Sequence, residues 1–181
     1  MIKSLKFVAF VSCFVLFSCE KEQQSTEVIP KTERVTTVSK PTKDTIHIVA
    51  VGDIMIGSAF PSKAYLPQDD GVESFDRVKK YLIGDVVFGN LEGCFLDEGE
   101  SEKCKKNTKK DAVVTCYAFR MPTRYGKIIK EAGFNTLSIA NNHVGDFGNA
   151  GRKKTAAVLD DLNIHYAGQI EQPYDIFEIE G

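Results

Sequence analysis

Three clusters of polar side chains in this sequence carry residue types that can bind a metal ion or move a proton. Asp53 follows one apolar run, Asn90 and Glu92 follow a second, and a third run leads into residues 141–146. Carboxylates, an imidazole and amide oxygens are ligands that Mn²⁺, Mg²⁺ or Zn²⁺ accept. A turn, a strand exit or a capped loop also explains each cluster taken singly, so a metal site requires that the three meet in space.

The elements around these clusters alternate between apolar runs and helical periodicity, which is typical of an α/β fold. The apolar runs predict strands at residues 46–51, 85–88, 134–140, 164–167 and 175–179, and extended chain at 113–119. The first run is rich in β-branched residues, as expected for a strand covered on both faces. Helical spacing predicts helices at residues 73–83, 125–132 and 150–162, with Gly133 as the C-cap of the second.

This order of elements predicts a mostly parallel sheet flanked by helices. The carboxyl ends of parallel strands share one edge, and ligands bind in the crevice outside that edge. All three polar clusters follow predicted strand ends. We therefore expect side chains that are far apart in the sequence to converge there on one site.

The composition is that of a globular domain, with 43% hydrophobic and 27% charged residues in 181. A formal net charge of −2 provides no basic stripe for a phosphate backbone, so the sequence predicts no nucleic-acid partner.

Residues 1–18 have the pattern of a signal peptide, in which Lys3 and Lys6 precede an apolar run. That run, residues 7–17, is shorter than the about 20 residues that a transmembrane helix needs. Export is therefore the expectation, with the folded domain at residues 45–181.

The run ends in Leu-Phe-Ser-Cys, which resembles a lipobox and predicts lipidation at Cys19. The alternative is an incidental thiol near a standard cleavage site. The polar residues that follow, with Pro30 and Pro41, predict a flexible tether over residues 19–44. We expect an exported protein that a lipid anchors to the membrane of the bacterial cell envelope.

Cys94, Cys104 and Cys116 lie close together in a chain that is predicted to leave the reducing cytosol. A disulfide between Cys104 and Cys116 would close a loop, but three cysteines leave the pairing open. The polar insert between Cys94 and Cys116 is expected to be a solvated loop that could border the crevice.

Four motifs resemble the CapA family of capsule-synthesis proteins in order and spacing. They are Val-Gly-Asp-Ile-Met-Ile-Gly (51–57), Phe-Gly-Asn-Leu-Glu (88–92), Phe-Arg-Met-Pro (119–122), and Ala-Asn-Asn-His (140–143) with Asp146 and Gly148. The resemblance covers residues 46–179. It implies a calcineurin-like metallophosphatase fold and a role in making, attaching or exporting poly-γ-glutamate at the cell surface.

The resemblance also implies roles for individual residues. The metal-site residues would be Asp53, Glu92, Asn142 and His143. Catalysis would involve His143 and Asp146, and Asn90 and Asn141 would contact the substrate. The implied cofactor is a divalent metal ion, Mn²⁺, Zn²⁺ or Mg²⁺.

Two features depart from the metallophosphatase pattern. Such proteins have Asp-x-His at the first strand, where this sequence has Asp53-Ile54-Met55. They also have further histidines downstream, whereas His47 and His165 lie within predicted strands as packed or surface residues. The sequence therefore resembles the N-terminal part of the domain, and a sheet interrupted there would leave an unpaired edge and an uncovered apolar face.

Three functions follow from these observations. The first is a cell-surface capsule-assembly factor acting on poly-γ-glutamate. The second is a metal-dependent hydrolase of a phosphoester or an amide. The third is a lipid-anchored, non-catalytic module that binds a small anion without a metal. The missing downstream histidines favour the first function over the second.

Overall fold

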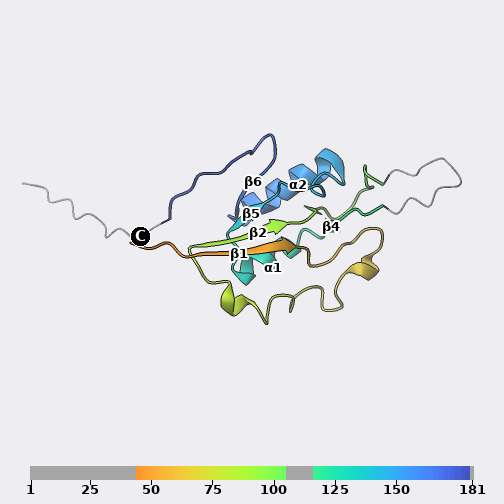
Figure 1. Ribbon diagram of the computed structural model, residues 1–181. Coiled ribbons are helices and arrows are strands. Elements are labelled where there is room, and N and C mark those ends of the chain that lie inside the picture. The colour runs from red at the N-terminus through yellow and green to blue at the C-terminus, as the bar shows by residue number, and fades with distance from the viewer. Residues whose placement is uncertain (1–43, 105–115, 180–181) are drawn as a thin grey trace, which may run out of the picture. The chain divides into compact units, whose positions relative to one another are not determined.

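The computed structural model describes residues 44–104 and 116–179 (Figure 1). The predicted signal peptide, Cys19 and all of the tether except Asp44 lie outside the described residues. Within the described ranges, no helix has both the length and the apolar character needed to cross a bilayer.

A four-stranded parallel sheet with the strand order β1-β2-β5-β6 organises the described chain (Figure 1). Its strands are β1 (Ile48–Ile54), β2 (Val86–Leu91), β5 (Thr136–Ser138) and β6 (His165–Ala167). A second, two-stranded parallel sheet pairs β3 (Cys94–Phe95) with β4 (Arg120–Met121). The prediction of a mostly parallel α/β fold is confirmed.

Two α-helices occur where the periodicity predicts them. Helix α1 spans Tyr125–Ala132 and helix α2 spans Gly148–Asp161. Gly133 ends α1 with a φ of 115°, and its N–H group donates to the carbonyls of Ile129 and Lys130. A left-handed residue in this position favours glycine, so the sequence signal for the C-cap has a direct physical cause.

The predicted helix at residues 73–83 is wrong. This stretch consists of turns followed by the short 3₁₀ helix η2 (Lys79–Tyr81), and another 3₁₀ helix, η1 (Lys63–Tyr65), precedes it. Asp70 and Gly71 have positive φ values, and the Asp69 carboxylate accepts hydrogen bonds from the Gly71 and Glu73 N–H groups. These side-chain hydrogen bonds stabilise turns at the point where an α-helix would begin.

The strands predicted at residues 46–51, 85–88, 134–140 and 164–167 are correct in place but not in extent. Strand β1 continues through Asp53, with a shift in register between Ala50 and Asp53. Residues 116–119 form no strand, and residues 113–115 lie outside the described ranges. The strand predicted at residues 175–179 is wrong, since this stretch is irregular; the Asp175 side chain hydrogen-bonds the His165 ring.

Strand β1 is not covered on both faces as predicted. Ile48 is 68% exposed and Val51 is 39% exposed. The reason is the strand order, because β1 forms an edge of the sheet in the described part of the chain.

One core holds the sheet and both helices together. Val87, Leu91 and Leu137 from the sheet pack in the same buried cluster as Ile129 of α1 and Leu159 of α2. Burial of these side chains is the main stabilising contribution, about 1.5–3 kcal/mol for each large aliphatic group. The core therefore fixes the strands whose ends carry the polar clusters.

Candidate functional site

The ends of β1 and β2 bring the first two polar clusters together. Asp53 lies opposite Asn90 in the ladder. The Asn90 amide nitrogen donates to Asp53 Oδ1 at 2.8 Å and to Glu92 Oε2 at 2.9 Å. Asn141, which follows β5, donates to Asn90 Oδ1 at 3.2 Å. We call Asp53, Asn90, Glu92 and Asn141 the strand-end cluster.

Asn141 connects this cluster to the loop that carries His143. Its amide nitrogen donates to the Leu91 carbonyl at 2.8 Å. Its amide oxygen accepts hydrogen bonds from the N–H groups of His143 at 3.0 Å and Val144 at 2.9 Å. An asparagine that caps backbone N–H groups two and three residues ahead stabilises a tight turn. Asn141 therefore fixes the position of the His143 backbone.

His143 and Asp146 form a buried pair. The imidazole Nδ1 lies 2.6 Å from Asp146 Oδ2, and Asp146 is 1% exposed. Because a carboxylate accepts hydrogen bonds, Nδ1 carries the proton in the neutral ring and Nε2 keeps its lone pair. Nε2 lies 3.7 Å from Glu92 Oε1, so the lone pair faces the strand-end cluster.

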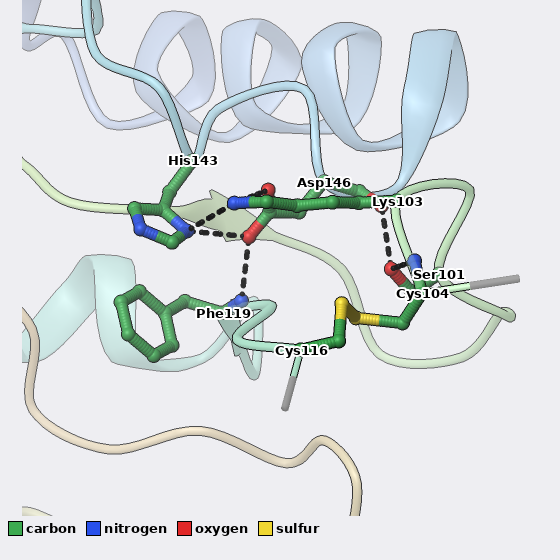
Figure 2. Close-up of a disulfide and its surroundings, with 7 residues drawn as sticks. All are labelled: Ser101, Lys103, Cys104, Cys116, Phe119, His143 and Asp146. Carbon is green, nitrogen blue, oxygen red and sulfur yellow. Dashed lines mark hydrogen bonds and ion pairs between the residues drawn. A yellow bond between two sulfur atoms is a disulfide. The ribbon is translucent and has the colours of Figure 1, made fainter. Parts of the chain in front are cut away.

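Two further residues contact this pair (Figure 2). The Lys103 ammonium pairs with Asp146 Oδ1 at 3.0 Å. It also lies 3.3 Å from His143 Nδ1, where in the Nδ1–H tautomer two donors face each other and the attraction comes from the shared carboxylate alone. The Phe119 N–H donates to Asp146 Oδ2 at 2.9 Å, and the Phe119 ring stacks on the imidazole with centroids 4.2 Å apart. Sequence analysis missed both contacts, although Phe119 opens one of the four motifs.

The structure therefore links six of the predicted site residues through direct contacts, namely Asp53, Asn90, Glu92, Asn141, His143 and Asp146. Asn142 lies apart from them. It is exposed, and its side chain makes no hydrogen bond within the described part of the chain. The assigned metal, catalytic and substrate roles of all seven residues stay predictions.

The donor set can be tested for its fit to a divalent cation. Two carboxylates meet at one amide group, and an imidazole lone pair faces one of them, which is suitable chemistry for Mn²⁺, Zn²⁺ or Mg²⁺. In residues 44–104 and 116–179, however, no three side chains of His, Cys, Asp or Glu lie close enough together to form a metal site. The residue types fit, but side-chain movements would be needed to bring Asp53, Glu92 and His143 to one ion.

The other two described histidines lie elsewhere. The backbone N–H of His47 donates to Asp85. His165 forms its own pair with Asp175, 2.8 Å from Nδ1 to Oδ2, and Phe177 stacks on its ring. Within the described part of the chain, neither histidine contacts the strand-end cluster, which agrees with their interpretation as packed or surface residues.

The cysteines divide into a disulfide and a buried thiol. Cys104 and Cys116 form the disulfide, which settles the pairing that the sequence left open. Burial raises the pKa of the Cys94 thiol to about 12. Because the thiolate is the reactive form, Cys94 is an inert packing residue.

Two largely apolar cavities flank the loop after β1. One, of about 460 Å³, is lined by Val51, Asp53 and Phe75 among others. The other, of about 430 Å³, is lined by residues that include Tyr117 and Phe119. Met55 contributes to both, and Asp53 of the strand-end cluster lines the first.

Comparison with known proteins identifies the family. Residues 47–178 match the family model described as bacterial capsule synthesis protein PGA_cap. The chain is 31% identical over 154 residues to the capsule biosynthesis protein CapA of Bacillus anthracis. Two uncharacterized proteins of Sinorhizobium fredii, y4uA and y4sH, are each 29% identical over 126 residues, which is 69% of this chain and 25% of each relative.

This chain belongs to the bacterial capsule synthesis protein family, and the resemblance to CapA is confirmed. The alignment with CapA covers 83% of this chain and 35% of CapA. The chain thus spans about a third of the length of that relative. Membership in a capsule-synthesis family agrees with a place at the cell envelope.

Proposed function

We propose that this chain is part of an exported, lipid-anchored capsule-synthesis protein whose strand-end cluster and His143 bind a divalent cation and act on poly-γ-glutamate. The observation that carries this proposal is the orientation of His143. Its Nδ1 is hydrogen-bonded to the buried Asp146, and its Nε2 lies 3.7 Å from Glu92. An imidazole held in this way is prepared to bind a metal ion or to accept a proton.

Asp53, Glu92 and His143 are the residues that would hold the ion. A bound divalent cation would polarise an oxygen of the substrate and lower the pKa of a coordinated water. The chain's own residues supply the rest: Asn90 keeps the two carboxylates at one point, and Asp146 fixes the imidazole tautomer.

A polymer of glutamate is negatively charged, and so are the carboxylates of the strand-end cluster. Their mutual repulsion would weaken binding unless a cation lies between them. A divalent ion would therefore serve both the substrate and the site. This argument supports a metal-dependent role in synthesis, attachment or export of the polymer.

A hydrolase of a phosphoester or an amide is the second candidate, and the buried His143–Asp146 pair is the observation that favours it. Such a pair can move a proton to or from a reacting group. A non-catalytic module would instead bind the polymer or a small anion whether or not a metal is present. Metal dependence and turnover therefore separate the three functions.

The test is metal binding by the full chain, measured by elemental analysis and by titration calorimetry with Mn²⁺ and Zn²⁺. We expect near-stoichiometric metal in the wild type and its loss in His143→Ala. The matched control is His165→Ala, which removes an imidazole from another His–Asp pair. Equal metal content in all three proteins, or none in a folded wild type, would refute the metal site.

Activity and polymer binding are measured on the same proteins. Poly-γ-glutamate retention that needs Mn²⁺ and His143, without release of products, supports the assembly role. Metal-dependent release of γ-glutamyl fragments, or of p-nitrophenol from its phosphate ester, supports the hydrolase. Poly-γ-glutamate retention that depends on neither the metal nor His143 supports the non-catalytic module.

The predicted lipid anchor has its own test. We expect Cys19→Ala to move the protein from the membrane fraction to the soluble fraction and to abolish incorporation of labelled palmitate. Cys13→Ala is the matched control, because Cys13 lies inside the predicted signal peptide. Continued lipid labelling of the Cys19→Ala protein would contradict the anchor.

A further inference from the structure

The Cys104–Cys116 disulfide joins two segments that both contact Asp146 (Figure 2). The segments are residues 101–104 and residues 116–119, and neither belongs to a helix or a strand. No backbone ladder therefore holds one segment to the other. We call the two segments and their disulfide the disulfide clamp.

The first segment contacts the main chain and the carboxylate of Asp146. Ser101 Oγ and the N–H groups of Glu102 and Lys103 all donate to the Asp146 carbonyl, at 2.9–3.3 Å. Ser101 Oγ also accepts a hydrogen bond from the Cys104 N–H at 3.0 Å, which connects this contact to the disulfide. The Lys103 ammonium then pairs with Asp146 Oδ1.

The second segment contacts the other side of the pair. The Phe119 N–H donates to Asp146 Oδ2, the same oxygen that accepts from His143 Nδ1. The Phe119 ring stacks on the imidazole at an interplanar angle of 28°. This segment therefore limits rotation of both side chains.

We propose that the disulfide clamp positions His143, acting through Asp146, Lys103 and Phe119, so that Nε2 faces Glu92. The proposal rests on the proposed function for its purpose, because an imidazole needs this orientation to serve the strand-end cluster. Cys104 and Cys116 are 12 residues apart in sequence, and the disulfide removes their freedom to separate. Lys103 and Phe119 are positioning residues. The disulfide holds their two segments together, so that both residues contact Asp146 at the same time.

Groups that orient a metal-binding imidazole through its second nitrogen influence metal affinity strongly, by about 10- to 100-fold. The disulfide clamp supplies such groups, and one of them, Lys103, lies outside the four family-like motifs. The positive charge of Lys103 also compensates the buried carboxylate of Asp146. Without Lys103, that carboxylate would have no Lys or Arg partner within the described part of the chain.

The test compares the oxidised full chain with the same chain reduced by dithiothreitol, which closes to its own cyclic disulfide as it reduces the protein. Long-range ¹H–¹⁵N spectra of the histidine rings report which nitrogen carries the proton. We expect a single Nδ1–H form of His143 in the oxidised protein and exchange between forms after reduction. His165 is the internal control, and we expect no change in its ring signals.

The double variant Cys104→Ser/Cys116→Ser should show the reduced pattern with or without the reductant. Mn²⁺ affinity should fall by about 10- to 100-fold on reduction. Where reduction also unfolds the core, Lys103→Met in the oxidised protein provides the same readout, and Lys103→Arg should restore it.

An unchanged His143 ring spectrum, in a protein whose disulfide is shown by alkylation to be open, overturns the proposal. An unchanged spectrum in Lys103→Met does the same. The ring spectrum needs no metal, so it tests the clamp even if the wild type binds none. Failure to bind metal would contradict the proposed function alone.

Discussion

Replacement of Thr155 by valine should destabilise the fold through one hydrogen bond. Thr155 lies in α2 and is fully buried, and its hydroxyl oxygen accepts from the Phe95 N–H of β3 at 2.9 Å. Valine has nearly the same shape, so Thr155→Val removes this acceptor without opening a cavity. The Phe95 N–H then stays buried without a partner.

The cost follows from the desolvation of that group. A buried donor that loses its partner destabilises a protein by about 1–3 kcal/mol. The Thr155 hydroxyl also donates to the Gly151 carbonyl at 2.8 Å, but that carbonyl lies within α2 and keeps its helical partner. We therefore expect a loss of about 2 kcal/mol, which comes almost wholly from Phe95.

Urea unfolding followed by circular dichroism measures the effect. With a slope of about 2 kcal/mol per molar urea, the midpoint should fall by about 1 M while the slope stays the same. Thr155→Ser is the control, because it keeps the hydroxyl and loses one methyl group, at a cost of about 1 kcal/mol. A valine variant as stable as the wild type, or more stable than the serine variant, would refute the reasoning.

Three further predictions test the fold at other points. Gly133→Ala should destabilise the protein by more than about 1 kcal/mol in urea unfolding. The left-handed φ of 115° alone costs an alanine about 1 kcal/mol. In addition, the new Cβ would lie 2.5 Å from the Leu82 carbonyl oxygen. The hydrogen bond from Arg124 lowers the pKa of Asp70 from its ordinary 3.8, so this pair stabilises the fold above that pH and stops doing so as the pH falls through the lowered value. Asp70→Asn should therefore lower the thermal midpoint at neutral pH, with a difference from wild type that vanishes in acid. Cys94 should resist iodoacetamide in the native protein and react on unfolding, as peptide mapping would show; labelling of the native thiol would contradict its raised pKa.

The parts of the fold that the sequence predicts well are those that one local pattern determines. The helix from Tyr125 to Ala132 has both an apolar face and a glycine C-cap, and the structure contains both. The strands β1, β2 and β5 coincide with apolar runs, and their shared direction brings the polar residues at or just after their ends to one edge. Convergence of the three clusters could therefore be predicted without coordinates.

The parts that were missed depend on contacts between distant segments. Phe75 and Val78 have helical spacing, but the hydrogen bonds of Asp69 and the positive φ of Asp70 produce turns before them. Lys103 is one of several lysines in a polar insert, and only the disulfide geometry distinguishes it. No local signal shows that a particular lysine reaches Asp146.

Asn141 and Asn142 show the same limit at the scale of one residue. The two are identical in type and adjacent in sequence, so a motif cannot separate their roles. In the structure, the first caps the turn and contacts Asn90, while the second is exposed. The turn geometry decides which of the two faces the cluster, because successive side chains in a tight turn point in different directions.

The charges divide the site into two halves, and this division indicates where a cation would bind. In the first half, the buried Asp146 is paired with Lys103 at 3.0 Å. In the second half, Asp53 and Glu92 meet only at the neutral amide of Asn90, and neither forms an ion pair with Lys or Arg in the described part of the chain.

Two carboxylates held at one amide group repel each other, more weakly where solvent screens them. A divalent ion between Asp53 and Glu92 would relieve this repulsion, whereas an ion at Asp146 would first have to displace Lys103. His143 lies between the halves, with Nδ1 turned to Asp146 and Nε2 turned to Glu92. In the proposed function the two nitrogens would thus have separate tasks: Nδ1 would hold the ring in place, and Nε2 would be available to a metal ion or a substrate.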